Sequence, residues 1–161
     1  MRSNGILRGS NSNNHIIQDK ETIMDIKVKV DAGGYMPEKA HNSDAGFDLR
    51  TPIDTYIAPL GSVTIDTKVH MVIPDGYAGV IISKSGLNMK HDLTSTGLVD
   101  AGYTGTIQVK LYNNGDHLHS FNKGDKISQI MIVPIPEVKL IKTESLEETE
   151  RGANGFGSSG R

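Results

Sequence analysis

The last eleven residues of the chain, 151–161, combine groups that could bind phosphate. Four glycines, two serines and Arg151 surround a single aromatic residue, Phe156. Glycine lets backbone amides turn towards an anion, serine hydroxyls donate hydrogen bonds, and arginine supplies a fixed positive charge. The Phe156 ring could stack on a nucleobase. Composition alone also fits a plain Gly/Ser tail, so the rest of the chain decides between the two interpretations.

Four earlier segments also place polar side chains around glycine, and each of them alone fits an ordinary turn. The segments are 44–49, 83–88, 97–105 and 124–129. The first has two carboxylates, whose oxygens suit Mg²⁺. In the second, Lys84, Ser85 and free backbone amides could hold phosphate oxygens. Asp100 and Tyr103 belong to the third, which is predicted to form a hairpin.

Length and composition limit the classes of protein that the chain could be. Its 161 residues suffice for one domain, and 17 basic against 19 acidic side chains make it nearly neutral. This balance argues against a dedicated nucleic-acid or membrane-surface binder. Cysteine is absent, and no apolar run is long enough to cross a membrane. We therefore expect a cytoplasmic protein, or one of another intracellular compartment.

Residues 1–23 are rich in Ser, Asn and Gly, and they carry Arg2 and Arg8 without an acid before Asp19. An organelle-targeting leader has a similar composition. No amphipathic apolar face is visible, so we interpret the segment as a disordered or expression-derived leader without a function of its own.

From Met24 the pattern changes to short runs with a period of two, which is typical of half-buried strands. The expected strands are 26–30, 62–73, 77–83, 106–112, 126–133 and 137–142. Only 87–91 and 143–150 are expected to form short helices. Many short strands with turn residues between them indicate an all-β barrel or sandwich over 24–142.

Taken in this order, the five polar segments resemble the motifs of the trimeric deoxyuridine triphosphate nucleotidohydrolase (dUTPase) family. The resemblance covers 26–160, and 97–105 and the tail are its most diagnostic parts. It implies a jelly-roll-like β fold assembled as a homotrimer, in which 143–161 form an arm that closes over a neighbour's active site. The implied reaction is hydrolysis of dUTP to dUMP and pyrophosphate, by water that attacks the α-phosphorus of a Mg²⁺-bound triphosphate. The reaction keeps uracil out of DNA and supplies dUMP for thymidylate synthesis.

The resemblance also implies a role for individual residues. Asp48 corresponds to the carboxylate that holds the metal through water, Asp100 to the residue that activates the attacking water, and Tyr103 to the ring under the deoxyribose. Phe156 covers the uracil. The other implied substrate-binding residues are Lys84, Ser85, Gly86, Asn88, Thr94, Gly97, Val99, Gln129, Arg151, Gly157, Ser158 and Ser159. A tight hairpin around 94–98 is expected to exclude the thymine methyl group by a steric clash.

The chain departs from the usual family pattern at three positions. Lys84 replaces an arginine, and it supplies the charge without the planar fork of guanidinium. Asn154 replaces a glycine in the tail, where asparagine still tolerates a left-handed backbone. Thr104 stands where a basic residue often follows the tyrosine, and we give it no catalytic role.

Two other functions remain possible from the sequence. A dCTP deaminase of the same fold would need a glutamate near the hairpin, and residues 86–113 contain none. A regulatory nucleotide-binding protein of this fold tends to carry an extra insertion, whereas the spacing from Asp100 to Gly124 leaves room for only a strand and a turn. The six histidines lack the spacing of a zinc site and are interpreted as surface or core-edge residues.

Overall fold

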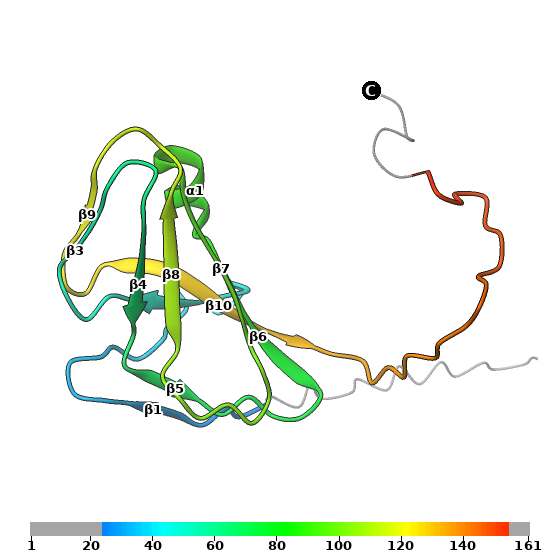
Figure 1. Cartoon of the computed structure of the whole chain (residues 1–161). Helices are drawn as coiled ribbons and strands as arrows, with labels where there is room; N and C mark the ends of the chain where they lie inside the picture. Colours follow the sequence, from blue (N-terminus) through cyan, green and yellow to red (C-terminus); the bar gives the residue numbers. More distant parts are fainter. Residues whose placement is uncertain (1–23, 155–161) are drawn as a thin grey trace, which may run out of the picture.

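A computed structural model of the chain describes residues 24–154, which form an all-β domain with one short helix (Figure 1). The elements are β1 Val28–Val30, β2 Phe47–Arg50, β3 Thr55–Ile57, β4 Ser62–Asp66, β5 Val69–Met71, β6 Tyr77–Ile82, α1 Ser85–His91, β7 Leu93–Val99, β8 Gln108–Asn113, β9 His119–Phe121 and β10 Lys126–Pro134. The all-β prediction is confirmed. No helix within 24–154 is long and apolar enough to cross a membrane.

The strands pair antiparallel in one sheet of order β2-β10-β6-β7-β8-β4 and in two small sheets, β1-β5 and β3-β9. Strand β7 pairs with two different strands, each over about half of its length. Its second half pairs with β6, from Thr96 to Val99, and its first half pairs with β8, from Leu93 to Ser95. Because β7 leaves one partner for the other, the sheet curls around its core as in a jelly roll.

Side-chain alternation along β8 explains why this strand forms where it does. Val109 and Leu111 are buried, whereas Gln108 and Lys110 are exposed, as their period of two predicts. The buried face packs into a core of aliphatic side chains from nearly every strand, among them Ile65, which lies opposite Val109 on β4. Each fully buried aliphatic side chain contributes about 1.5–3 kcal/mol to folding. The resulting scaffold fixes the positions of the loops at both ends of the sheet.

Two predicted elements near the C-terminus are wrong. Residues 137–142 form no strand and 143–150 form no helix; after β10 the chain runs away from the sheet (Figure 1). Pro134 and Pro136 lack the N–H that would continue the ladder beyond β10. The segment 143–150 is short, exposed and rich in glutamate, so no packing compensates for the cost of helix nucleation.

Other predictions differ in detail. The run 62–73 is divided into β4 and β5 by Lys68, whose φ of 64° breaks the strand. The expected hairpin around 94–98 lies instead within β7, because Gly97 serves close packing rather than a turn. A Cβ atom there would lie 3.3 Å from Cδ1 of Ile81. Between Asp100 and Gly124 the chain forms two strands, β8 and β9, rather than one, since three-residue strands carry almost no periodicity.

Candidate active site

The first group of predicted site residues gathers around Asp48 on β2. Its carboxylate is almost fully buried and is ion-paired with two ammonium groups, those of Lys84 and Lys126. The Lys126 Nζ–Asp48 Oδ2 distance is 2.5 Å. Lys84 follows β6 and Lys126 begins β10, so adjacent strands β2, β10 and β6 bring the three side chains together. We call these residues, with Gln129, the Asp48 cluster.

The charges of the Asp48 cluster keep its carboxylate ionised. Burial alone would raise the pKa of Asp48, but hydrogen bonds from Lys126 and Lys84 outweigh burial and hold the pKa below its ordinary value. With two ammonium groups around one carboxylate, the cluster carries a net positive charge. It is therefore suited to an anion such as a phosphate group.

Gln129 lies beside Asp48 in the β2–β10 register and donates a hydrogen bond from Nε2 to the Ser83 carbonyl at 3.1 Å. Beneath it, buried hydroxyls connect three strands. The Ser95 and Ser128 Oγ atoms are 2.7 Å apart, and Ser128 Oγ donates to the Ile82 carbonyl at 2.9 Å. No buried side-chain polar atom of the described residues lacks a partner. This network holds the ends of β6 and β10 firmly under the Asp48 cluster.

Three predicted substrate-binding residues, Ser85, Gly86 and Asn88, lie on α1 directly after Lys84. No side chain caps this helix start, and Ser85 and Gly86 are exposed. A Cβ atom on Gly86 would meet nothing within 4 Å, so the surface around it is open. The structure thus places these three residues next to the Asp48 cluster.

The second group of predicted residues lies on the connection between β7 and β8, residues 100–107, which we call the Asp100 loop. Asp100 and Tyr103 are exposed and border a pocket of about 310 Å³. The predicted residues Gly97 and Val99 line the same pocket. Tyr103 donates a hydrogen bond from its hydroxyl to the Thr106 carbonyl at 3.1 Å, which fixes the ring against the loop.

Within a single chain, the Asp48 cluster and the Asp100 loop lie far apart. Strands β6 and β7 are antiparallel, with Gly79 opposite Val99, so Asp100 lies beside Ala78. Lys84 is six residues further along from Ala78, which at 3.3 Å per residue amounts to roughly 20 Å. The predicted substrate residue Thr94 lies at the Lys84 end of β7, where its hydroxyl accepts a hydrogen bond from Asn114.

The C-terminal segment also lies apart from both groups. Arg151 is exposed, and within residues 24–154 its side chain donates a hydrogen bond only to the carbonyl of Asn154, at 3.2 Å (Nε–O). The chain between Ile135 and Asn154 extends away from the sheet (Figure 1). The predicted residues Phe156, Gly157, Ser158 and Ser159 lie outside the described residues.

Lys126 is the member of the Asp48 cluster that the sequence analysis did not single out. It stands in the turn segment 124–129, of which only Gln129 was proposed to bind substrate. Its contact with Asp48 depends on the pairing of β2 with β10, which are far apart in the sequence. In the sequence, Lys126 is simply a lysine at the start of an expected strand. Lysine is common at such positions, so its type gives no sign of the contact with Asp48.

Comparisons with known proteins agree with this arrangement. The family model of dUTPase matches residues 33–160, a range that contains the first four polar segments and all but the last residue of the fifth. The deoxyuridine 5'-triphosphate nucleotidohydrolase of Tropheryma whipplei (strain Twist) is 40% identical over 133 residues, which are 80% of this chain and 91% of the relative. A probable enzyme of the same name from Schizosaccharomyces pombe is 38% identical over 126 residues, covering 78% and 90%.

A solved structure shares the whole fold. The Staphylococcus bacteriophage 80alpha dUTPase with dUPNHPP is similar with a TM-score of 0.79 and 32% sequence identity, and the match covers 85% of this chain and 99% of that one. The chain therefore has a jelly-roll fold that carries the Asp48 cluster and the Asp100 loop. It is also similar in sequence to dUTPases over most of its length. The chain belongs to the dUTPase family.

Proposed function

We propose that the protein hydrolyses dUTP to dUMP and pyrophosphate in an intracellular compartment, as a homotrimer with active sites shared between chains. The observation that carries the proposal is the match, over 99% of its length, to a dUTPase solved with dUPNHPP. The activity in the names of the curated relatives is the same. The separation of the Asp48 cluster from the Asp100 loop supports the shared site.

The residues of the chain divide the chemistry between them. Lys84 and the open backbone at the start of α1 bind phosphate oxygens, and Lys126 keeps Asp48 neutralised when Lys84 turns towards the substrate. Asp100 aligns the attacking water and accepts its proton. Because a carboxylate is a weak base, its main contribution is to position the water. Tyr103 packs against the deoxyribose, where a 2′-hydroxyl would clash. Charge neutralisation and positioning then account for most of the catalysis.

The donor set fits a Mg²⁺ ion that arrives on the triphosphate. The described residues contain no group of three acidic or histidine side chains that could hold a metal by themselves. A single buried carboxylate, Asp48, suits contact through a water molecule of an ion that the phosphates already bind. Such an ion would offset the negative charge of the phosphate oxygens, which otherwise repels the water that attacks the phosphorus.

The C-terminal arm completes the site in this proposal. Arg151, Ser158 and Ser159 neutralise phosphate charge from a neighbouring chain, Gly157 lets the backbone approach the phosphates, and Phe156 stacks on the uracil. In one chain Arg151 contacts neither group of site residues, which supports its action on another copy. Closure of the arm would exclude bulk water, and its opening would release the product.

A nucleotide panel tests the proposed function. The full-length protein with Mg²⁺ is given dUTP, dCTP, dTTP and UTP separately, and pyrophosphate and orthophosphate are both measured. We expect pyrophosphate from dUTP alone. Comparable hydrolysis of another nucleotide, or release of orthophosphate, would refute the assignment. A His117→Gln variant serves as the matched control, because His117 is exposed, belongs to neither group and lies on the connection before β9.

A further inference from the structure

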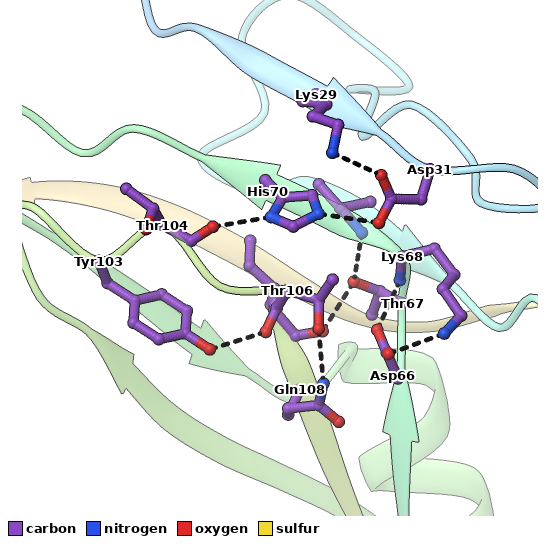
Figure 2. Close-up of polar contacts among 12 residues, drawn as sticks. Lys29, Asp31, Asp66, Thr67, Lys68, His70, Tyr103, Thr104, Thr106 and Gln108 are labelled. Carbon is purple, nitrogen blue, oxygen red and sulfur yellow. Dashed lines mark hydrogen bonds and ion pairs between the residues drawn. The ribbon is translucent and has the colours of Figure 1, made fainter.

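His70 on β5 links the Asp100 loop to the strand β1 region (Figure 2). One ring nitrogen, Nδ1, lies 2.7 Å from the Thr104 carbonyl oxygen of the loop. The other, Nε2, lies 2.9 Å from Oδ2 of Asp31, which follows β1. The imidazole therefore bridges two segments that are far apart in the sequence, and both of its nitrogens are used.

Both partners of the ring can only accept hydrogen bonds. A carbonyl oxygen carries no hydrogen, and Asp31 stays ionised because hydrogen bonds from His70 and Lys29 lower its pKa to about 2. A neutral imidazole has a single N–H, so it can donate to one partner while its lone pair faces the other oxygen. Only the imidazolium form, with two N–H groups, satisfies both contacts.

Charged groups surround the ring on each packed element. Lys29 lies opposite His70 in the β1–β5 register and is ion-paired with Asp31 at 2.9 Å. Before β5, Asp66 and Lys68 neutralise each other at 2.9 Å. From the loop side, the Tyr103 hydroxyl is directed to the Thr106 carbonyl (Figure 2). Asp31 is thus the charge that favours the imidazolium, and Lys29 partly opposes it.

Three attachments hold the Asp100 loop along β5 and its flanks. The loop ends with Ile107, whose backbone exchanges hydrogen bonds with Val69 and Thr67 at 2.7 and 3.1 Å. Near its start, Gly102 donates weakly to the Ile73 carbonyl at 3.4 Å. Between them, the ring of His70 holds the Thr104 carbonyl. Of these three attachments only the middle one changes with protonation.

We propose that protonated His70 is a positioning residue, which clamps the Thr104 carbonyl and thereby holds Asp100 and Tyr103 in place for the reaction. The inference rests on the proposed function. His70 touches no substrate; it acts through the loop, since Tyr103 and Thr104 are adjacent residues. This also gives Thr104 a use that its side chain does not reveal, because only its carbonyl takes part.

The hydrogen bond from protonated His70 to the Thr104 carbonyl, which we call the clamp, should be lost as pH rises. Hydrogen bonds to Asp31 and to the Thr104 carbonyl raise the pKa of His70 above its ordinary value of 6.5. The contribution of the clamp is therefore complete below pH 6.5 and is lost as pH rises through the raised pKa. Above it, we expect kcat/KM to fall about three- to tenfold, the change that one hydrogen bond of ordinary net strength controls.

Two variants and one spectroscopic titration test the clamp on the full-length protein. His70→Gln retains an amide donor for Thr104 but has no proton to lose, so the alkaline fall in kcat/KM should disappear. Asp31→Asn keeps an acceptor but removes the charge, so the fall should move to lower pH. His117→Gln, which alters an exposed histidine outside the loop, should leave the wild-type profile unchanged.

NMR of the wild-type protein provides a readout that needs neither a variant nor catalysis. The His70 imidazole should titrate above pH 6.5, and the amide signals of Thr104 and Gly105 should shift with the same midpoint. A titration at or below 6.5, or loop amides that do not follow it, would overturn the proposal. An unchanged alkaline fall in His70→Gln would do the same. If dUTP is not hydrolysed at all, the proposed function fails while the titration still judges the clamp.

Discussion

Complementation between two inactive chains tests the shared site most sharply. The Asp48 cluster and the Asp100 loop of one chain are roughly 20 Å apart along the β6–β7 pair. One variant, Lys84→Met, removes the ammonium charge of the first group but keeps an apolar side chain of similar length. The other, Asp100→Asn, preserves shape in the second group but cannot accept a proton.

The expected magnitude follows from how chains combine. Asp100→Asn alone should lose about 10²–10⁴-fold in turnover, as is usual when a general base is removed. In a trimer assembled at random from equal amounts of the two variants, a site is intact when one chain supplies a normal Lys84 and its neighbour a normal Asp100. This occurs for about one quarter of all sites. Because trimers of a single variant contain no intact site, purified mixed trimers should have about one intact site in three, or roughly 33% of the wild-type activity.

The assay needs co-expression of the two variants with different affinity tags, followed by two-step purification and measurement of pyrophosphate release. Separately purified variants, mixed without exchange of chains, provide the control and should stay inactive. Mixed trimers without recovered activity would mean that each site is built within one chain, which the β6–β7 register forbids. That result would refute the reasoning from the structure.

The remaining predictions concern the arm and the packing under the Asp48 cluster. Removal of 151–161 should leave a folded trimer by light scattering but abolish dUTP hydrolysis, and full activity in the truncated protein would show that the segment is a linker. Gly46→Ala should leave the melting temperature nearly unchanged but raise KM by roughly three- to tenfold, the effect of one lost hydrogen bond. The new Cβ would lie 2.7 Å from Oε1 of Gln129, a flexible side chain that must leave the Ser83 carbonyl. An unchanged KM would mean that Gln129 does not bind phosphate.

Much of the fold could be predicted because its signals are local. The alternation of buried and exposed residues in β8 gives that strand directly, and the polar sequence before β7 gives the short helix α1. Three-residue strands such as β3 and β9 could not be found in this way, because they form only through their mutual pairing. The apolar residues after Pro134, such as Leu140, alternate as in a strand, but among the described residues no strand pairs with them and Leu140 stays exposed.

The individual residues of the candidate site could be predicted from the sequence, but the contacts between them could not. Lys84 and Asp100 stand in recognisable segments, and their residue types indicate their chemistry. The pairing of Lys126 with Asp48 depends on two strands that are distant in sequence, and the contact of His70 with Thr104 uses a backbone carbonyl. A carbonyl has no residue type, so no sequence pattern can indicate its role.

The opposite directions of β6 and β7 affect how the protein behaves as it is made and diluted. If each site is shared between chains as proposed, a newly synthesised chain can fold completely and still be inactive, because it holds only parts of different sites. Hydrolysis would then begin only when chains assemble, so activity at low expression would rise more steeply than the amount of protein. A defective chain would also inactivate sites that it shares with normal chains.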